Sequence, residues 1–164
     1  MLPLRGIPKT NIAEGGSFFV FKAFLWYNIY KKEVVDMRIT YSLTKIFSSA
    51  QIFNVFKSVG WVNDISENDL YLAIMQSSHI VTAWYNGEII GLIRSMDDNI
   101  WNANIDCLIV NPKYQKMGIG KTLINLLLDE LKHIHYITVA PNEHKNIEFY
   151  KKLGFSFVEG SGVL

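Results

Sequence analysis

The sequence has few of the features that mark secreted, metal-binding or nucleic-acid-binding proteins. Its single cysteine, Cys107, excludes a disulfide within the chain and suits a reducing, cytoplasmic location. The 16 basic residues nearly balance the 15 acidic ones, and the net charge of +1 gives no electrostatic reason to expect nucleic acid as a partner. The four histidines lack the spacing of a metal site, so we expect no metal.

The chain also lacks a long uninterrupted apolar run. An aromatic stretch occupies residues 18–30, but Lys22 and Asn28 interrupt it, and it is shorter than the ~20 apolar residues that a spanning helix needs. We therefore expect no membrane span. We interpret residues 1–36 as an N-terminal appendage, with an interfacial amphipathic helix or a docked extra element of the domain as alternatives, and residues 37–164 as one folded domain.

What the sequence does contain is a series of short strands and amphipathic helices. Asn86-Gly87 is a preferred pair for a two-residue hairpin turn, because both positions need positive φ. Period-2 and helical apolar spacing predict an α+β fold in which helices flank a mixed sheet. The predicted strands are residues 38–43, 79–85, 88–96, 101–110, 136–140 (apolar and covered on both faces) and 155–158, and the predicted helices are residues 47–60, 66–77, 121–134 and 143–153.

The segment between the strand at 101–110 and the next helix has the composition of an anion site. Gly118 and Gly120 let the backbone approach a phosphate, the helix start offers unpaired amides, and Lys116 and Lys121 add positive charge. A purely structural turn is the alternative. A P-loop is not supported, because Gln115 stands where that motif requires glycine.

Two motifs resemble those of the GNAT acetyltransferase superfamily. Residues 115–120, Gln-Lys-Met-Gly-Ile-Gly, are similar to the family's (Gln/Arg)-x-x-Gly-x-(Gly/Ala) loop and follow a Pro-x-Tyr lead-in at 112–114. Residues 146–155, Asn-Ile-Glu-Phe-Tyr-Lys-Lys-Leu-Gly-Phe, resemble its second block. The likeness covers about residues 37–160. It implies a mostly antiparallel sheet with splayed central strands, and acetyl-CoA as the acyl donor.

The resemblance also implies which residues hold acetyl-CoA. Amides of the glycine loop would bind its pyrophosphate, and main-chain groups of the preceding strand would pair with the pantetheine arm. Asn142 could equally cap a helix start. The implied cofactor-binding residues are Leu108, Ile109, Val110, Gln115, Lys116, Met117, Gly118, Ile119, Gly120, Lys121, Asn142 and Asn146.

The expected reaction is direct attack of an amine on the thioester, and we predict two catalytic residues for it. Tyr150 matches the family's donor to the leaving thiolate, with core packing as the alternative. Asp106 is a carboxylate in an otherwise apolar strand and is the candidate base, with a paired structural role or a water relay as alternatives. Asn104, on the same strand face, cannot be a base. Cys107 should point away from Asp106 as a small buried residue.

The family's acceptor pocket lies beside the loop between the first two helices. Here that loop offers Trp61, Asn63 and Asp64 as substrate-binding residues, an aromatic wall next to a carboxylate. The sequence thus predicts an N-acetyltransferase acting on a primary amine of a small molecule or peptide. A non-catalytic acyl-CoA-binding sensor is the alternative, and a homodimer stays open.

Overall fold

The computed structural model describes residues 38–139 and 146–156. The predicted appendage at 1–36, Asn142 and most of the predicted last strand lie outside these residues. The described elements follow the predicted order. They are β1 (Thr40–Ser42), α2 (Ser49–Lys57), α3 (Glu67–Met75), β2 (His79–Tyr85), β3 (Glu88–Asp97), β4 (Asn102–Val110), the 3₁₀ helix η1 (Pro112–Tyr114), α4 (Ile119–Leu131), β5 (Tyr136–Val139) and α5 (Ile147–Lys151).

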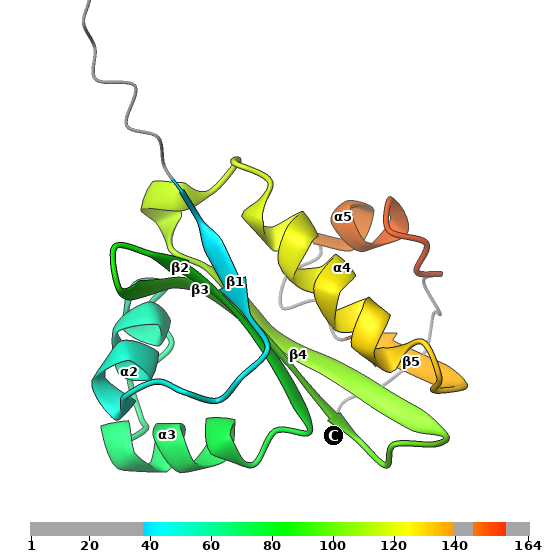
Figure 1. Ribbon diagram of the computed structural model, residues 1–164, viewed down its shortest axis with the longest axis horizontal. Helices are drawn as coiled ribbons and strands as arrows, with labels where there is room; N and C mark the ends of the chain where they lie inside the picture. Colours follow the sequence, from blue (N-terminus) through cyan, green and yellow to red (C-terminus); the bar gives the residue numbers. More distant parts are fainter. Residues whose placement is uncertain (1–37, 140–145, 157–164) are drawn as a thin grey trace, which may run out of the picture. The chain divides into compact units, whose positions relative to one another are not determined.

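The strands form one mixed sheet, which confirms the predicted fold class. The five described strands lie in the order β1-β2-β3-β4-β5, and every neighbouring pair is antiparallel except β4 and β5. The hairpin between β2 and β3 turns at Asn86 and Gly87, whose φ values are 50° and 79°, as their sequence predicts. Helices α2 and α3 lie on one face of the sheet and α4 on the other (Figure 1).

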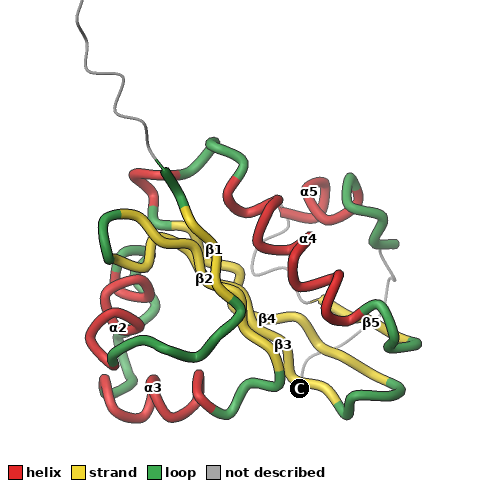
Figure 2. The backbone as a smooth tube through the Cα atoms, in the orientation of Figure 1, coloured by secondary structure: helices red, strands yellow, loops and turns green. Residues whose placement is uncertain are grey.

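Each face of the sheet has its own apolar core, because successive strand residues point to opposite sides. Figure 2 shows the sheet as a layer between these helices. The core under α4 includes Val81, Ile93, Ile105, Leu123 and Leu127. The core under α2 and α3 includes Ile52, Val55, Ile74, Leu92 and Ile109. Ile105 and Ile109 would share a face of a regular strand, so their separation shows that β4 changes face between them.

β5 differs from its prediction as a strand covered on both faces. Tyr136 is 57% exposed and Thr138 is also exposed, whereas Ile137 and Val139 are half-buried. β5 ends the sheet order and, among the described strands, pairs with β4 alone. It therefore alternates between core and water. The aromatic ring and the hydroxyl of its outward residues tolerate that exposure.

The described pairing of β4 with β5 is short. Its last described pair is Ile105 with Val139, whereas β4 continues to Val110 and keeps β3 as its partner. Among the described residues, 106–110 therefore have no strand partner on the side of β5, and we call this side their free edge. This is the splay of the central strands that the family resemblance implies.

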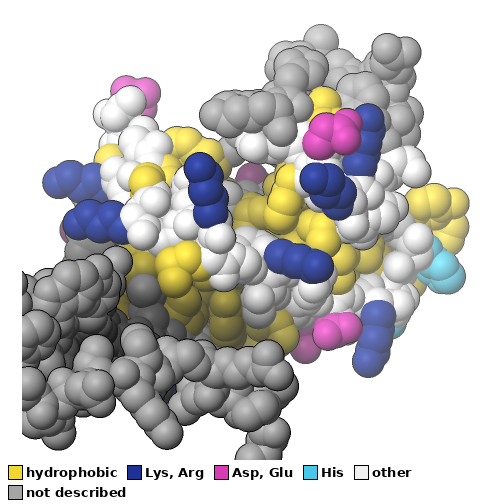
Figure 3. Space-filling view, turned by 90° about the horizontal axis from the view of Figure 1, so that it is seen from above, with side chains coloured by type: hydrophobic (Ala, Val, Ile, Leu, Met, Phe, Trp, Pro, Cys, Tyr) yellow, Lys and Arg dark blue, Asp and Glu magenta, His cyan; other side chains and the backbone are white. Residues whose placement is uncertain are grey.

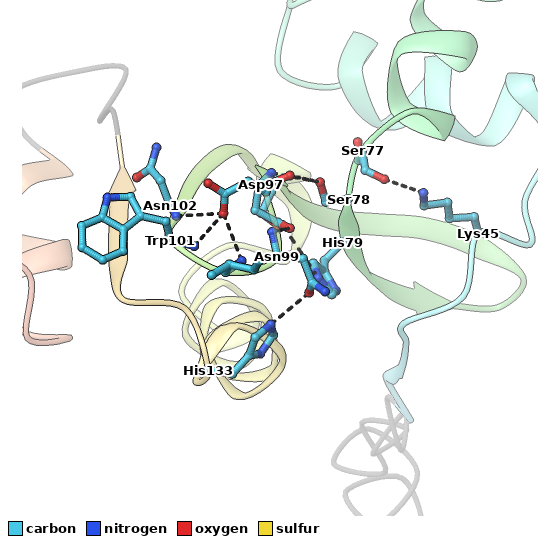
Figure 4. Close-up of polar contacts among 12 residues, drawn as sticks. Lys45, Ser77, Ser78, His79, Asp97, Asn99, Trp101, Asn102 and His133 are labelled. Carbon is cyan, nitrogen blue, oxygen red and sulfur yellow. Dashed lines mark hydrogen bonds and ion pairs between the residues drawn. The ribbon is translucent and has the colours of Figure 1, made fainter.

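At the opposite end of the sheet, polar contacts hold the turn between β3 and β4 in place (Figure 4). The Asp98 carboxylate accepts hydrogen bonds from the amides of Ile100, Trp101 and Asn102 at 3.0, 2.7 and 3.0 Å. These bonds lower the pKa of Asp98. His133, just after α4, lies 3.0 Å from the side-chain oxygen of Asn99. The helix end and the hairpin turn are thus joined.

Gly91 in β3 offers a test of how tightly α4 packs on the sheet. A Cβ at this position would lie 3.1 Å from the carbonyl oxygen of Ile109 and 3.1 Å from a methyl of Leu123. Because the carbonyl belongs to a paired strand, we expect Gly91→Ala to lower the free energy of unfolding by about 1–3 kcal/mol. Urea unfolding measures this.

Gly120→Ala is the matched control. A Cβ there would meet only ordinary contacts, at 3.7 Å from Val110 and 3.9 Å from Phe149. The change also replaces glycine within a helix, which favours folding by up to about 1 kcal/mol. Equal stability of the two variants would contradict the close approach at Gly91.

Candidate functional site

The site begins where the chain leaves β4 and enters α4. The helix starts at Ile119, so Gly120 lies in its first turn, whereas the sequence placed both glycines before the helix. Gly118 is the N-cap with a φ of 83°, and it has no side chain to cap the helix. The first helical hydrogen bond runs from the amide of Thr122 to the carbonyl of Gly118, at 3.0 Å. Within the described part of the chain, the amides of residues 117–121 therefore have no acceptor.

The loop before the helix has backbone angles of the kind found in anion-binding loops. Lys116 has a φ of 64° and Gly118 one of 83°, so two left-handed residues flank Met117. Such alternation turns successive amides inward, as in anion-binding nests. The side chain of Gln115 donates to the carbonyl of Val110 at 3.0 Å and fixes the loop to the end of β4. Gln115 thus braces the loop through its side chain.

A cavity of about 760 Å³ lies between this loop, the free edge of β4 and α5. Figure 3 shows the molecule from above, with a hollow in which hydrophobic side chains lie beside Lys and Arg side chains. Its described lining brings together most of the predicted cofactor-binding residues with Trp61 and Tyr150. The lining residues are Val59, Trp61, Leu108, Ile109, Val110, Pro112, Tyr114, Gln115, Lys116, Gly118, Ile119, Gly120, Lys121, Asn146, Phe149 and Tyr150.

The cavity lining differs from the predicted set of site residues at a few positions. Met117 is 47% exposed and is absent from the lining. Val59 and Phe149 line the cavity although no role was predicted for them. Phe149 precedes Tyr150 in the second motif, so the motif itself was the available signal. No feature of the sequence indicated that Val59 lines the cavity, because its place depends on how the chain turns after α2.

Charge is confined to one end of the cavity. Lys116 and Lys121 are the only charged side chains in its described lining, and both lie at the start of α4. They flank the unpaired amides, where the helix dipole also favours negative charge. The residues present therefore fit a diphosphate at this end. The other described lining residues are uncharged, and apart from Gln115 and Asn146 their side chains are apolar or aromatic.

Tyr150 lies in α5 with its ring buried and is 8% exposed. Its ring packs edge-on against Phe149 and Phe155, at centroid distances of 5.2 and 5.9 Å. Tyr150 lines the cavity, and among the described residues none forms a hydrogen bond with its hydroxyl. Burial first, and then the negative charge of Asp106, raise the pKa of Tyr150. The phenol therefore keeps its proton at physiological pH.

Asp106 follows the last described pair of β4 with β5, and it is held by two hydrogen bonds. Nη2 of Arg94 lies 2.9 Å from Oδ2, and the amide of Cys107 donates to Oδ1 at 2.7 Å. Burial disfavours the charged carboxylate, but these bonds outweigh it, and the pKa of Asp106 is below its ordinary 3.8. This pairing favours the structural alternative for Asp106 over the base.

Cys107 shows where β4 changes face. Its φ is 54°, and the register with β3 shifts between Leu92 and Arg94, so a β-bulge lies here. Cys107 packs with the α2 and α3 core, and Asp106 lies on the same face, since its partner Arg94 also donates to the carbonyl of Ala73 in α3. The prediction that it points away from Asp106 is wrong, because the bulge interrupts strand alternation. Burial, and then the charge of Asp106, raise the pKa of its thiol to about 11, so it stays protonated.

Of the predicted substrate-binding residues, only Trp61 lines the cavity. Asn63 and Asp64 are exposed on the loop before α3 and belong to no wall of the cavity. The sequence placed an aromatic wall and a carboxylate side by side. The structure brings the aromatic residue alone to the site.

A mixed sheet that opens beside a glycine-bearing helix start defines an acetyltransferase fold. The sequence model of the acetyltransferase (GNAT) family matches residues 42–155. The chain belongs to this family.

Within the described residues, no helix combines the length and the apolar character that crossing a bilayer requires.

Similar proteins have been described in algae, plants and bacteria. The chain is 33% identical over 103 residues to an uncharacterised N-acetyltransferase, ycf52, of Pyropia yezoensis, a match that spans 60% of this chain and 59% of that protein. It is 39% identical over 69 residues to histone acetyltransferase TAP1 of Glycine max, covering 41% of this chain and 29% of that protein. A GNAT family acetyltransferase from Streptococcus pneumoniae has a similar structure, with a TM-score of 0.68 and 28% identity over 77% of this chain and 96% of that one.

The ion pair of Asp106 should appear in the pH dependence of stability. Because its pKa is lowered in the folded state, its contribution is complete above about pH 4 and is lost as the pH falls through the folded value. We expect Asp106→Asn to lower the melting temperature at pH 7 and to converge on the wild type near pH 2. Thermal unfolding followed by circular dichroism measures both. A difference between the two proteins that does not change with pH would contradict the ion pair.

Proposed function

We propose that this protein transfers an acetyl group from acetyl-CoA to a primary amine of a small molecule or peptide. The observation that carries the proposal is one cavity lined both by residues 118–121, whose amides are unpaired among the described residues, and by Tyr150. Family membership supports acyl transfer. The names of the Pyropia and Glycine proteins, both acetyltransferases, support acetyl as the acyl group.

Each part of the cavity has a role in this proposal. The amides at the start of α4, with Lys116 and Lys121, bind the diphosphate, while main-chain groups of residues 108–110 pair with the pantetheine arm along the free edge of β4. Asn146 lies at the opposite wall, just before α5. Asn142, which lies outside the described residues, stays a predicted contact. When bound, acetyl-CoA supplies the activated thioester.

The protein's own residues then manage protons. The amine must be neutral to attack, although a free alkylammonium has a pKa of about 10. Asp106 is a weak base, since two hydrogen bonds hold it ionised, and we assign its proton-accepting role to water. As the C–N bond forms and the C–S bond breaks, the phenol of Tyr150 donates its proton to the sulfur and is restored from solvent. The predicted cytoplasmic location is unchanged by this proposal.

The anion site can be tested without disturbing the fold. Gly120→Asp places a carboxylate in the first turn of α4, where the helix dipole favours it and the added Cβ meets only ordinary contacts. We expect stability equal to or above the wild type, and a coenzyme A dissociation constant raised at least about tenfold by charge repulsion. Titration calorimetry measures the binding, and Gly120→Ala is the uncharged control. Undiminished binding in the Asp variant would remove the diphosphate from this position.

Tyr150→Phe tests the proton donor. The variant keeps the ring contacts and loses only the hydroxyl, so we expect kcat to fall by about 10²-fold or more while coenzyme A binding is kept. Because a donor works below its pKa, and that of Tyr150 lies above the ordinary 10.0, the wild type should lose activity only at strongly alkaline pH. Thiol release over an amine panel measures turnover.

Three results would change the assignment. Equal turnover of wild type and Tyr150→Phe would exclude this residue from the mechanism. Loss of turnover by more than about 10³-fold in Asp106→Asn would restore the carboxylate as the base. Coenzyme A binding without turnover of any amine would favour a sensor of acyl-CoA over an enzyme.

A further inference from the structure

Trp61 is presented to the cavity by the way α2 ends. Gly60 has a φ of 79°, its amide donates to the carbonyl of Lys57 at 3.1 Å, and the amide of Trp61 donates to the carbonyl of Phe56 at 3.1 Å. These two bonds form the Schellman arrangement of a helix C-terminus. In that arrangement the residue after the glycine packs back on the last turn of the helix. The indole of Trp61 does so, edge-on to Phe56 at a centroid distance of 6.4 Å.

This packing holds one side of the Trp61 indole, and within the described part of the chain the other side is left partly exposed. Phe56 beneath it is 4% exposed and belongs to the core, whereas Trp61 remains 39% exposed while lining the cavity. Val59, one residue before the glycine, lines the cavity beside it. Because the backbone and the inner side of the indole are already held, a molecule that covers the outer side meets a surface that loses little freedom on binding.

The described wall at this end offers apolar contact and no countercharge. The charged lining residues, Lys116 and Lys121, both lie at the start of α4, and no carboxylate is in the described lining. Asp106, the nearest carboxylate in β4, is occupied by Arg94. A phosphate-bearing or polycationic acceptor would leave its charges unpaired here, which costs binding energy. An apolar body would instead cover the indole and gain from its burial.

We infer that Trp61 is a specificity-determining residue, and that the acceptor is a primary amine carried on an aromatic or similarly bulky apolar body. This inference rests on the proposed acetyl transfer and narrows its substrate class. The indole positions the apolar body, so the amine faces the thioester beside Tyr150. The amine itself needs no carboxylate, since it reacts in its neutral form.

The test compares three amines of different chemistry at saturating acetyl-CoA: 2-phenylethylamine, glucosamine 6-phosphate and spermidine. We expect the wild type to favour 2-phenylethylamine by at least about tenfold in kcat/KM. Trp61→Ala should raise the KM for this amine at least about tenfold with kcat within about threefold, because uniform binding is lost. Trp61→Phe should recover most of the affinity. A preference for either of the other two amines would overturn the inference.

Trp101→Ala is the matched control. Trp101 is 56% exposed and packs against His135 and Tyr136 near the start of β4, away from the cavity. Its removal should leave the kinetics unchanged, whereas an equal effect of both variants would overturn the role of Trp61. Trp61→Ala could instead change the affinity for coenzyme A and leave the KM of the amine unchanged. That result would also overturn the inference, because the indole would then contact the cofactor and not the acceptor.

Failure of the proposed reaction is distinguishable from failure of this inference. If no amine is turned over, titration calorimetry still measures whether 2-phenylethylamine binds to the full chain loaded with coenzyme A. Binding that Trp61→Ala weakens at least about tenfold supports the inference while acetyl transfer fails. Absence of binding, or binding that Trp61→Ala leaves unchanged, overturns it.

Discussion

The site depends on one feature of backbone pairing: among the described residues, the β4–β5 ladder extends no further than Ile105 and Val139. A continuous parallel pair would leave residues 106–110 without a free edge and the sheet without an opening. Because β3 still pairs with β4 as far as Val110, the strand stays extended and ordered while its other edge is free. The cavity follows that edge, and the groups that line it come from segments before and after β4 in the chain.

Two helix ends, each bearing a left-handed glycine, complete the cavity. At the start of α4, Gly118 turns the chain so that unpaired amides face one point. At the end of α2, Gly60 returns the chain over the helix and directs Trp61 to the cavity. The two ends differ in chemistry because a helix start exposes N–H donors, whereas a helix end exposes carbonyls and must satisfy them internally. One end therefore suits an anion and the other an apolar body.

The ionisable groups are kept in separate roles by their partners. Arg94 and the amide of Cys107 keep Asp106 charged, and burial keeps both Tyr150 and Cys107 protonated. The charge of Asp106 in turn raises the pKa of Tyr150 and so supports its neutral form. A carboxylate that cannot readily accept a proton and a phenol that does not readily lose one are suited to positioning and to donation.

The sequence by itself determined the order of elements, the Asn86-Gly87 turn, the glycine loop and the second motif, because these depend on local spacing and local φ. It could not determine the partner of Asp106, since Arg94 meets it only across the β3–β4 register. Nor could it predict that Cys107 shares the face of Asp106, because a bulge breaks the alternation on which that prediction rested. Which side chains of the α2–α3 loop reach the cavity was likewise decided by tertiary structure: a turn fixes the path of the chain, but only packing against Phe56 fixes the direction of Trp61.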